Sequence, residues 1–388
     1  MDVAGRLPTE LVLHILESWS SAARDEREAH VERRCFYRAC SLVAHSLRRP
    51  SQRALAKSLY LTCRLEQVVE EFTHVQPLLP ASVDRLVIDL RDELLPPKES
   101  DRAKNLVMLC PRIRVLGLME LREVDFAQLA QLQRLERLHL HSLLWSAPDL
   151  RVVIPDAITP PPFVALTCLS LVNQCLPLYP ATLTPLSLFL TPTVLPNLTA
   201  LEIRDCCPRV VARSNQFHAT LNCFSLSTTN THYAEELELD RLLSSPLELL
   251  DLSPLTLVLA FLEDTGASLP PAACIRLHHD QHELPHLIRP DTCTPVVLTK
   301  LIAALSSKAA AASPFRNLER FEFPKAWPGR LNEHCQALLD VLQRLCDEVN
   351  VAYRFETDRD GSKAMHASRT ACFSSGFWKA VDRTGWPS

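Results

Sequence analysis

Apolar residues recur along most of the chain in one short pattern. An apolar position is followed by two residues of any kind, a second apolar position, one residue of any kind and a third apolar position, as in Leu135, Leu138 and Leu140. Because alternate residues of a strand point to the same face, the last two positions predict a strand with one buried face. The middle positions of the eleven instances are Leu59, Leu86, Leu116, Leu138, Leu169, Leu201, Phe224, Leu250, Ile275, Phe321 and Tyr353.

Stretches with helical character separate these predicted strands. They cover residues 65–72, 126–132, 233–243, 295–312 and 331–349. A short strand followed by a helical stretch, returning every 20–29 residues with looser insertions, is typical of a leucine-rich repeat. Such units stack into a solenoid, because no unit covers its own apolar edge. The alternative is a leucine-rich α/β domain without true repeats.

The first sixty residues have a different pattern, which predicts three short helices. Pro8 suits a first helical turn, and Leu11, Ile15 and Leu16 follow it as an apolar stripe. Residues 20–34 are polar and predict a connection. The second predicted helix carries Phe36, Cys40, Val43 and Leu47 on one face and ends at Arg48-Arg49-Pro50, and Ser51 is the expected N-cap of the third.

This N-terminal stretch resembles the F-box. The residues that carry the resemblance are Leu7-Pro8-Thr9-Glu10-Leu11, Ile15-Leu16 and Cys40-Ser41-Leu42-Val43. Two departures are that Leu47 stands where the family usually has a tryptophan, and that the linker between the first two helices is long, as in many fungal members. The whole chain is similar to F-box/leucine-rich-repeat proteins of the divergent fungal type.

The resemblance implies an α/β protein in three parts. Residues 1–57 form a three-helix F-box-like module, residues 58–356 form an irregular leucine-rich-repeat solenoid with a curved parallel sheet and helices outside, and residues 357–388 form a polar tail or cap. The implied function is that of a substrate-recognition subunit of a cullin-RING ubiquitin ligase. A Skp-type adaptor, and through it a cullin, bind the module, and a protein substrate binds the solenoid.

The expected contact residues follow from these roles. Apolar positions of the first two helices are expected to bind the adaptor; they are Leu7, Pro8, Leu11, Ile15, Leu16, Leu42, Val43 and Leu47. The alternative is that these helices only cap the first repeat. Polar positions in or beside the strands are expected to be exposed to a substrate; they are Arg85, Asp89, Arg114, His139, His141, Ser170, Glu202, Arg204 and Glu322.

Composition narrows the function classes. The chain has 7 glycines, none close to another, which excludes dinucleotide fingerprints and P-loops. Its formal net charge of -4 favours neither nucleic acid nor an anionic membrane as partner. The longest apolar run, residues 255–262, is far short of a membrane span. No signal-peptide pattern opens the chain, so we expect a cytoplasmic or nuclear protein whose 14 cysteines are reduced.

Catalytic motifs give no support for an enzyme. Residues 278–286 include a formal His-Glu-x-x-His, but Pro285 lies inside it and would break the helix that a zinc protease needs. We therefore expect no catalytic residues, no metal and no cofactor. Two other classes stay open: a leucine-rich-repeat scaffold unrelated to ubiquitin transfer, and, more remotely, a zinc-dependent enzyme using the His278–His286 cluster.

Overall fold

The structure is a computed structural model with two compact units. One unit comprises Met1–Leu166 with His366–Ser375, and the other comprises Thr167–Met365 with Gly376–Ser388. Each is described by itself. The structure describes residues 26–43, 45–62, 65–75, 80–90, 97–121, 124–142, 160–174, 185–217, 219–227, 247–253, 258, 272–277, 293–308, 313, 315–323, 331–355, 378 and 381.

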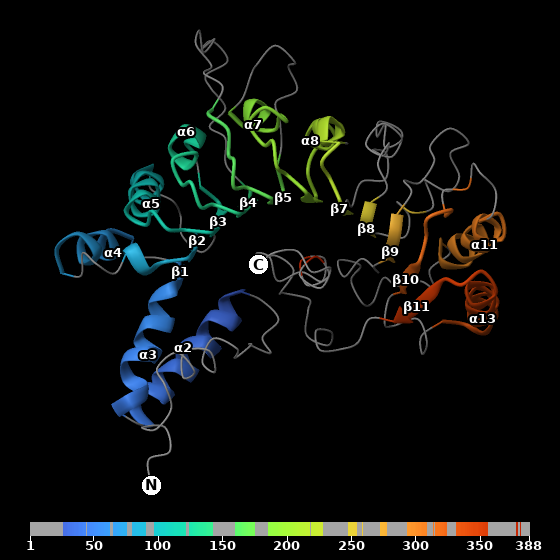
Figure 1. Ribbon diagram of the computed structural model, residues 1–388, viewed down its shortest axis with the longest axis horizontal. Helices are drawn as coiled ribbons and strands as arrows, with labels where there is room; N and C mark the ends of the chain where they lie inside the picture. The colour runs from blue at the N-terminus through green and yellow to red at the C-terminus, as the bar shows by residue number, and fades with distance from the viewer. Residues whose placement is uncertain are drawn as a thin grey trace. The chain divides into compact units, whose positions relative to one another are not determined.

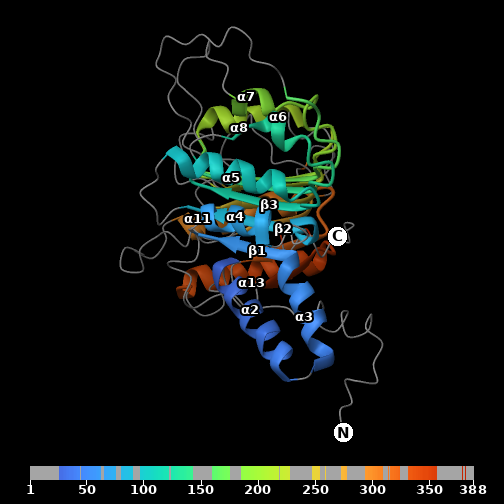
Figure 2. The same ribbon diagram turned by 90° about the vertical axis from the view of Figure 1, so that its left-hand side faces the viewer.

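The first unit begins with a pair of helices. α2 (Glu26–Val43) and α3 (His45–Lys57) pack side by side (Figure 2), around a small core of Tyr37 and Ala54. Arg33 Nη1 donates to Ser58 Oγ at 2.8 Å and ties α2 to the first strand. The predicted helix at residues 7–19 lies outside the described residues.

The helix boundaries correct two predictions. The segment expected to be a polar connection is helical from Glu26, because its glutamate, arginine and alanine residues are good helix formers on an exposed face. Arg48-Arg49-Pro50 does not end a helix: α3 runs through Pro50, and Ser51 is a buried helix-interior residue rather than an N-cap. Proline removes one backbone hydrogen bond here, and packing of the helix pair compensates for that loss.

Four parallel strands follow in the first unit. They are β1 (Ser58–Leu61), β2 (Arg85–Asp89), β3 (Val115–Met119) and β4 (Arg137–His141). Their ladder places the predicted middle positions side by side, in the order Leu59, Leu86, Leu116 and Leu138. The connections carry α4 (Leu65–Glu70), a π-helical turn η2 (Glu71–Val75), a 3₁₀ turn η3 (Pro80–Ser82), α5 (Pro97–Leu109) and α6 (Phe126–Leu129).

Seven parallel strands form the sheet of the second unit, in chain order. They are β5 (Cys168–Val172), β6 (Ala200–Arg204), β7 (Cys223–Ser227), β8 (Leu247–Ser253), β9 (Ala272–Leu277), β10 (Arg320–Phe323) and β11 (Ala352–Phe355). Again the ladder joins the predicted middle positions, which are Leu169, Leu201, Phe224, Leu250, Ile275, Phe321 and Tyr353. The prediction of an α/β fold built on recurring parallel strands is confirmed.

The helices of the second unit lie along one face of its sheet (Figure 1). They are α7 (Pro185–Phe189), α8 (Pro208–Ser214), a 3₁₀ turn η4 (Asn215–Phe217), α11 (Cys293–Ser306) and α13 (Glu333–Glu348). The apolar side chains of the strands are buried towards these helices, as Leu201 and Ile203 show in β6. The helix predicted at residues 233–243 lies outside the described residues.

The turn after several strands has one recurring conformation. Glu120, Ser142, Asn173 and Asp205 each follow the last residue of a strand and have positive φ, between 44° and 55°. In three of these turns the backbone N–H of this residue donates to a backbone carbonyl oxygen of the next strand, at N–O distances of 2.8 to 2.9 Å. The pairs are Glu120 with His141, Asn173 with Arg204 and Asp205 with Ser227. This added bond offsets the cost of the left-handed conformation, which non-glycine residues rarely adopt.

Candidate interaction face of the second sheet

The sheet face opposite the helices of the second unit carries an in-register row of polar side chains. Because side chains alternate along a strand, the residue after each middle apolar position points away from the core. One such residue from each strand stands beside the next in the ladder. The row, called the polar row below, consists of Ser170, Glu202, Ser225, Asp251, Arg276, Glu322 and Arg354.

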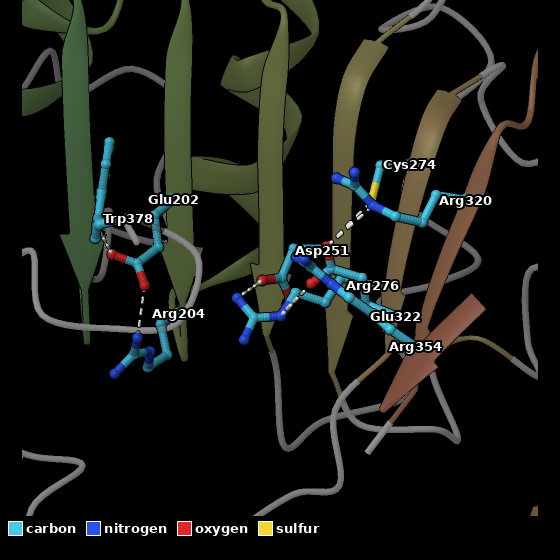
Figure 3. A network of polar contacts seen from close by, with 9 residues as sticks. All are labelled: Glu202, Arg204, Asp251, Cys274, Arg276, Arg320, Glu322, Arg354 and Trp378. Atoms are coloured by element: carbon cyan, nitrogen blue, oxygen red, sulfur yellow. Dashed lines mark hydrogen bonds and ion pairs between the residues drawn. The ribbon is translucent and has the colours of Figure 1, made fainter. Parts of the chain in front are cut away.

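Glu202 is the centre of the first charged cluster in this row (Figure 3). Its side chain is 2% exposed and accepts hydrogen bonds from Ser170 Oγ at 2.6 Å, Trp378 Nε1 at 2.7 Å and Arg204 Nη2 at 2.5 Å. Burial lowers the pKa of the Arg204 guanidinium, but the Glu202 carboxylate outweighs this effect and the net pKa is raised. The guanidinium of Arg204 therefore keeps its charge beside the buried Glu202 side chain.

The second cluster gathers three arginines around two carboxylates. Arg276 lies between Asp251 and Glu322, with Nη1 3.9 Å from Asp251 Oδ2 and Nε 3.6 Å from Glu322 Oε2. Arg320 Nε lies 3.2 Å from Glu322 Oε1, and Arg354 Nη2 pairs with the same oxygen. Figure 3 shows these side chains converging from neighbouring strands. A buried carboxylate shared by several guanidinium groups is well compensated for the loss of water.

The side chains of this face are suited to non-covalent contacts. Arginine does not lose its proton in proteins and so cannot act as a base. The nearby thiols are poor nucleophiles, because burial raises the pKa of Cys223 to about 12 and that of Cys274 to about 11. Paired charges and hydrogen-bond donors that point away from the core fit a surface that binds another molecule.

The sheet of the first unit has a polar group of its own. Tyr60 donates its hydroxyl to Asp89 Oδ2, and the rings of His139 and His141 meet edge to face with centroids 6.2 Å apart. Beside β3, Arg114 binds Glu136 through two hydrogen bonds of 2.8 Å, and these raise the pKa of the guanidinium. Each of these contacts lies within the first unit.

The structure corrects the expected exposure of the substrate-binding candidates. Six of them are buried: Asp89, His139, His141, Ser170, Glu202 and Glu322. Adjacent strands lie only about 4.8 Å apart, so long polar side chains cover one another and form contacts instead of standing free in solvent. Arg85, Arg114 and Arg204 are half-buried.

Sequence reasoning missed six residues of the face, which are Ser225, Asp251, Arg276, Arg320, Arg354 and Trp378. Asp251, Arg276 and Arg354 occupy the same position of their repeats as Glu202 and Glu322, one residue after the middle apolar residue. Applying that rule to every repeat would have found all three. Trp378 had no such signal, because it lies 176 residues from its partner in the chain.

The adaptor-binding candidates are only partly described. Leu7, Pro8, Leu11, Ile15 and Leu16 lie outside the described residues. Val43 is the last residue of α2, and Leu42 beside it is 83% exposed. Leu47 instead packs against the Tyr37–Ala54 core within the helix pair.

A metal site is absent from the described parts of the chain. They contain no group of three or more histidine, cysteine, aspartate or glutamate side chains that could hold a metal ion. The His278–His286 cluster lies outside them. A hollow of about 310 Å³ in the first unit is lined by residues that carry no acid, base or nucleophile, Phe163 and Gln133 among them. None of the described helices is long and apolar enough to cross a membrane.

Comparison with known proteins identifies no family for the chain. No protein-family model matches it, and no curated protein matches it either.

Proposed function

We propose that this protein is the substrate-recognition subunit of a cullin-RING ubiquitin ligase. The N-terminal helices would act as an F-box that binds a Skp-type adaptor, and the strands would be those of a leucine-rich-repeat solenoid that binds a protein substrate. The observation that carries this proposal is the polar row, which consists of one in-register residue from each strand of the second unit, projecting away from the core. Repeat proteins use extended faces of this kind to bind other proteins.

The exposed apolar surface of α2 supports the adaptor half of the proposal. Leu42 and Val31 are exposed at 83% and 53%, and they lie eleven residues apart, close to three full turns, on one side of the helix. Tyr37 points to the opposite side, into the core with α3. A helix with one buried and one exposed apolar side is suited to docking in a partner's groove.

The proposed function assigns no bond chemistry to the chain. Its contribution would be proximity: binding a substrate on one part while an adaptor holds another part in the ligase. Holding two reactants together replaces a bimolecular encounter by an effectively unimolecular step, which supplies a large rate gain without any catalytic group. The raised pKa values of the buried thiols fit this passive role.

A pull-down with a purified Skp-type adaptor tests the proposal. The parent chain is compared with Leu42→Asp and with a Leu11→Asp/Ile15→Asp double variant. A charge in an apolar docking surface is expensive when it becomes buried, so we expect both variants to lose the adaptor. Val341→Asp in α13 is the matched control, because Val341 is also a partly exposed apolar helix residue, and it should retain binding.

Failure of a folded parent chain to bind the adaptor would refute the ligase assignment. The repeat scaffold without a link to ubiquitin transfer would then be the better explanation, with α2 and α3 as its cap. Far-UV circular dichroism establishes that each variant is folded. Because Leu42 is largely exposed, its replacement by aspartate leaves the core of the helix pair intact.

A further inference from the structure

The charges of the second cluster are sorted by sign between the interior and the solvent. The side chains of Asp251 and Glu322 are both 4% exposed, whereas those of Arg320 and Arg354 are 40% and 41% exposed. Arg276 lies between these extremes at 10%. An approaching molecule therefore meets guanidinium groups first, although each of them has a carboxylate beneath it.

We propose that the face of strands β9 to β11 binds a carboxylate-rich segment of a protein partner, with Arg354 as its principal anchor. This inference rests on the proposed receptor function, since it takes the polar row as the substrate surface. A guanidinium has five N–H donors in a planar fork that matches a carboxylate, and the pairing of Arg354 with Glu322 occupies one nitrogen. Arg354 is also the exposed arginine that belongs to the polar row itself, whereas Arg320 lies two residues before the row position of β10.

The spacing of the arginines favours an extended peptide. Arg276 and Arg354 stand in the same row on strands separated by one further strand, so their backbones are roughly 10 Å apart. Residues three apart in an extended chain are also separated by roughly 10 Å. A segment that crosses the strands with an acidic residue at every third position therefore places one carboxylate at the exposed Arg354 and the next above the position of Arg276, whose side chain is 10% exposed.

The charge beneath the arginines favours carboxylate over phosphate. Glu322 contacts Arg276, Arg320 and Arg354. A carboxylate adds a single negative charge above it, whereas a phosphate ester carries close to two at neutral pH and is repelled more strongly by Glu322. The proposal therefore commits to aspartate- and glutamate-rich partners.

The test is fluorescence anisotropy of the full chain with a fluorescein-labelled glycine peptide that has glutamate at every third position. Peptides with glutamine or phosphoserine at those positions are the comparison probes. Arg354→Gln should weaken glutamate-peptide binding about five- to tenfold, the typical effect of losing one charge-assisted contact. Arg344→Gln is the matched control, because Arg344 is an exposed arginine of α13 and its loss changes the net charge equally.

Binding of the glutamate peptide that falls with salt and with Arg354→Gln, but not with Arg344→Gln, supports the proposal. It is overturned if the glutamine peptide binds equally well, if both arginine variants weaken binding equally, or if only the phosphoserine peptide binds. Arg320→Gln provides a second variant should Arg354→Gln fail to fold. Adaptor capture does not involve these arginines, so the pull-down and the peptide assay can fail independently.

Discussion

The contact between Trp378 and Glu202 allows the most quantitative prediction. Trp378 is fully buried, and its Nε1 donates to a Glu202 carboxylate oxygen at 2.7 Å. Trp378→Phe keeps an aromatic ring and removes this donor. A hydrogen bond to a charged group contributes about 1.5–3 kcal/mol, and the smaller ring leaves a void that costs about 1 kcal/mol more. We expect the free energy of unfolding to fall by about 2.5–4 kcal/mol.

Urea denaturation followed by circular dichroism measures this loss, and a double-mutant cycle isolates the hydrogen bond. In a Glu202→Gln background the acceptor is neutral, so Trp378→Phe should cost about 1–2 kcal/mol less than in the parent. The ring-size contribution is common to both backgrounds and cancels. A loss below about 0.5 kcal/mol in the parent, or the same loss in both backgrounds, would refute the reasoning that Glu202 depends on this donor.

Three further predictions concern stability. Burial raises the pKa of Cys110 and Cys346 to about 12, so above about pH 9 these thiols stay protonated in the folded chain while they ionise in the unfolded chain. The free energy of unfolding should therefore fall between about pH 9 and 12, by up to about 1.4 kcal/mol per pH unit for each thiol. Urea titrations at stepped pH measure this fall. Asn332→Ala removes the side-chain cap of α13 and should cost about 1 kcal/mol in thermal melts. Tyr60→Phe leaves the buried Asp89 without this donor and should cost about 1–3 kcal/mol; an unchanged urea midpoint would contradict the contact.

The sequence predicts the strands of this protein better than its helices. Leu59, Leu138 and Phe321 illustrate why: a middle apolar position is fixed by burial on a sheet, and each of them stands in the ladder where the pattern placed it. The predicted start of helix α2 was nine residues too late, because an exposed helical face built from charged residues has the composition of a loop. Apolar periodicity locates buried faces and gives no information on solvated ones.

The candidate site was only partly predictable for a related reason. Period alone places Glu202 and Glu322 on the open face. It does not show that Arg204 of the same strand pairs with Glu202, or that Arg276 and Arg354 of the neighbouring strands pair with Glu322. Such contacts depend on which residues the ladder brings together, and that requires knowledge of the register. The pairing of Trp378 with Glu202 joins distant parts of the chain and leaves no local trace in the sequence.

The row residues of neighbouring strands pair directly with one another in the ladder, and this register has a consequence for how the binding preference of the face can change. Because neighbouring strands pair without a shift in register, each strand of the second sheet contributes one residue to a continuous row, from Ser170 on β5 to Arg354 on β11. The connections between strands differ in length without altering the polar row. A new binding preference therefore needs only one substitution where the row residue is exposed, as Arg354 is, whereas a change at the buried Glu202 or Glu322 also requires a change in the arginines that pair with it.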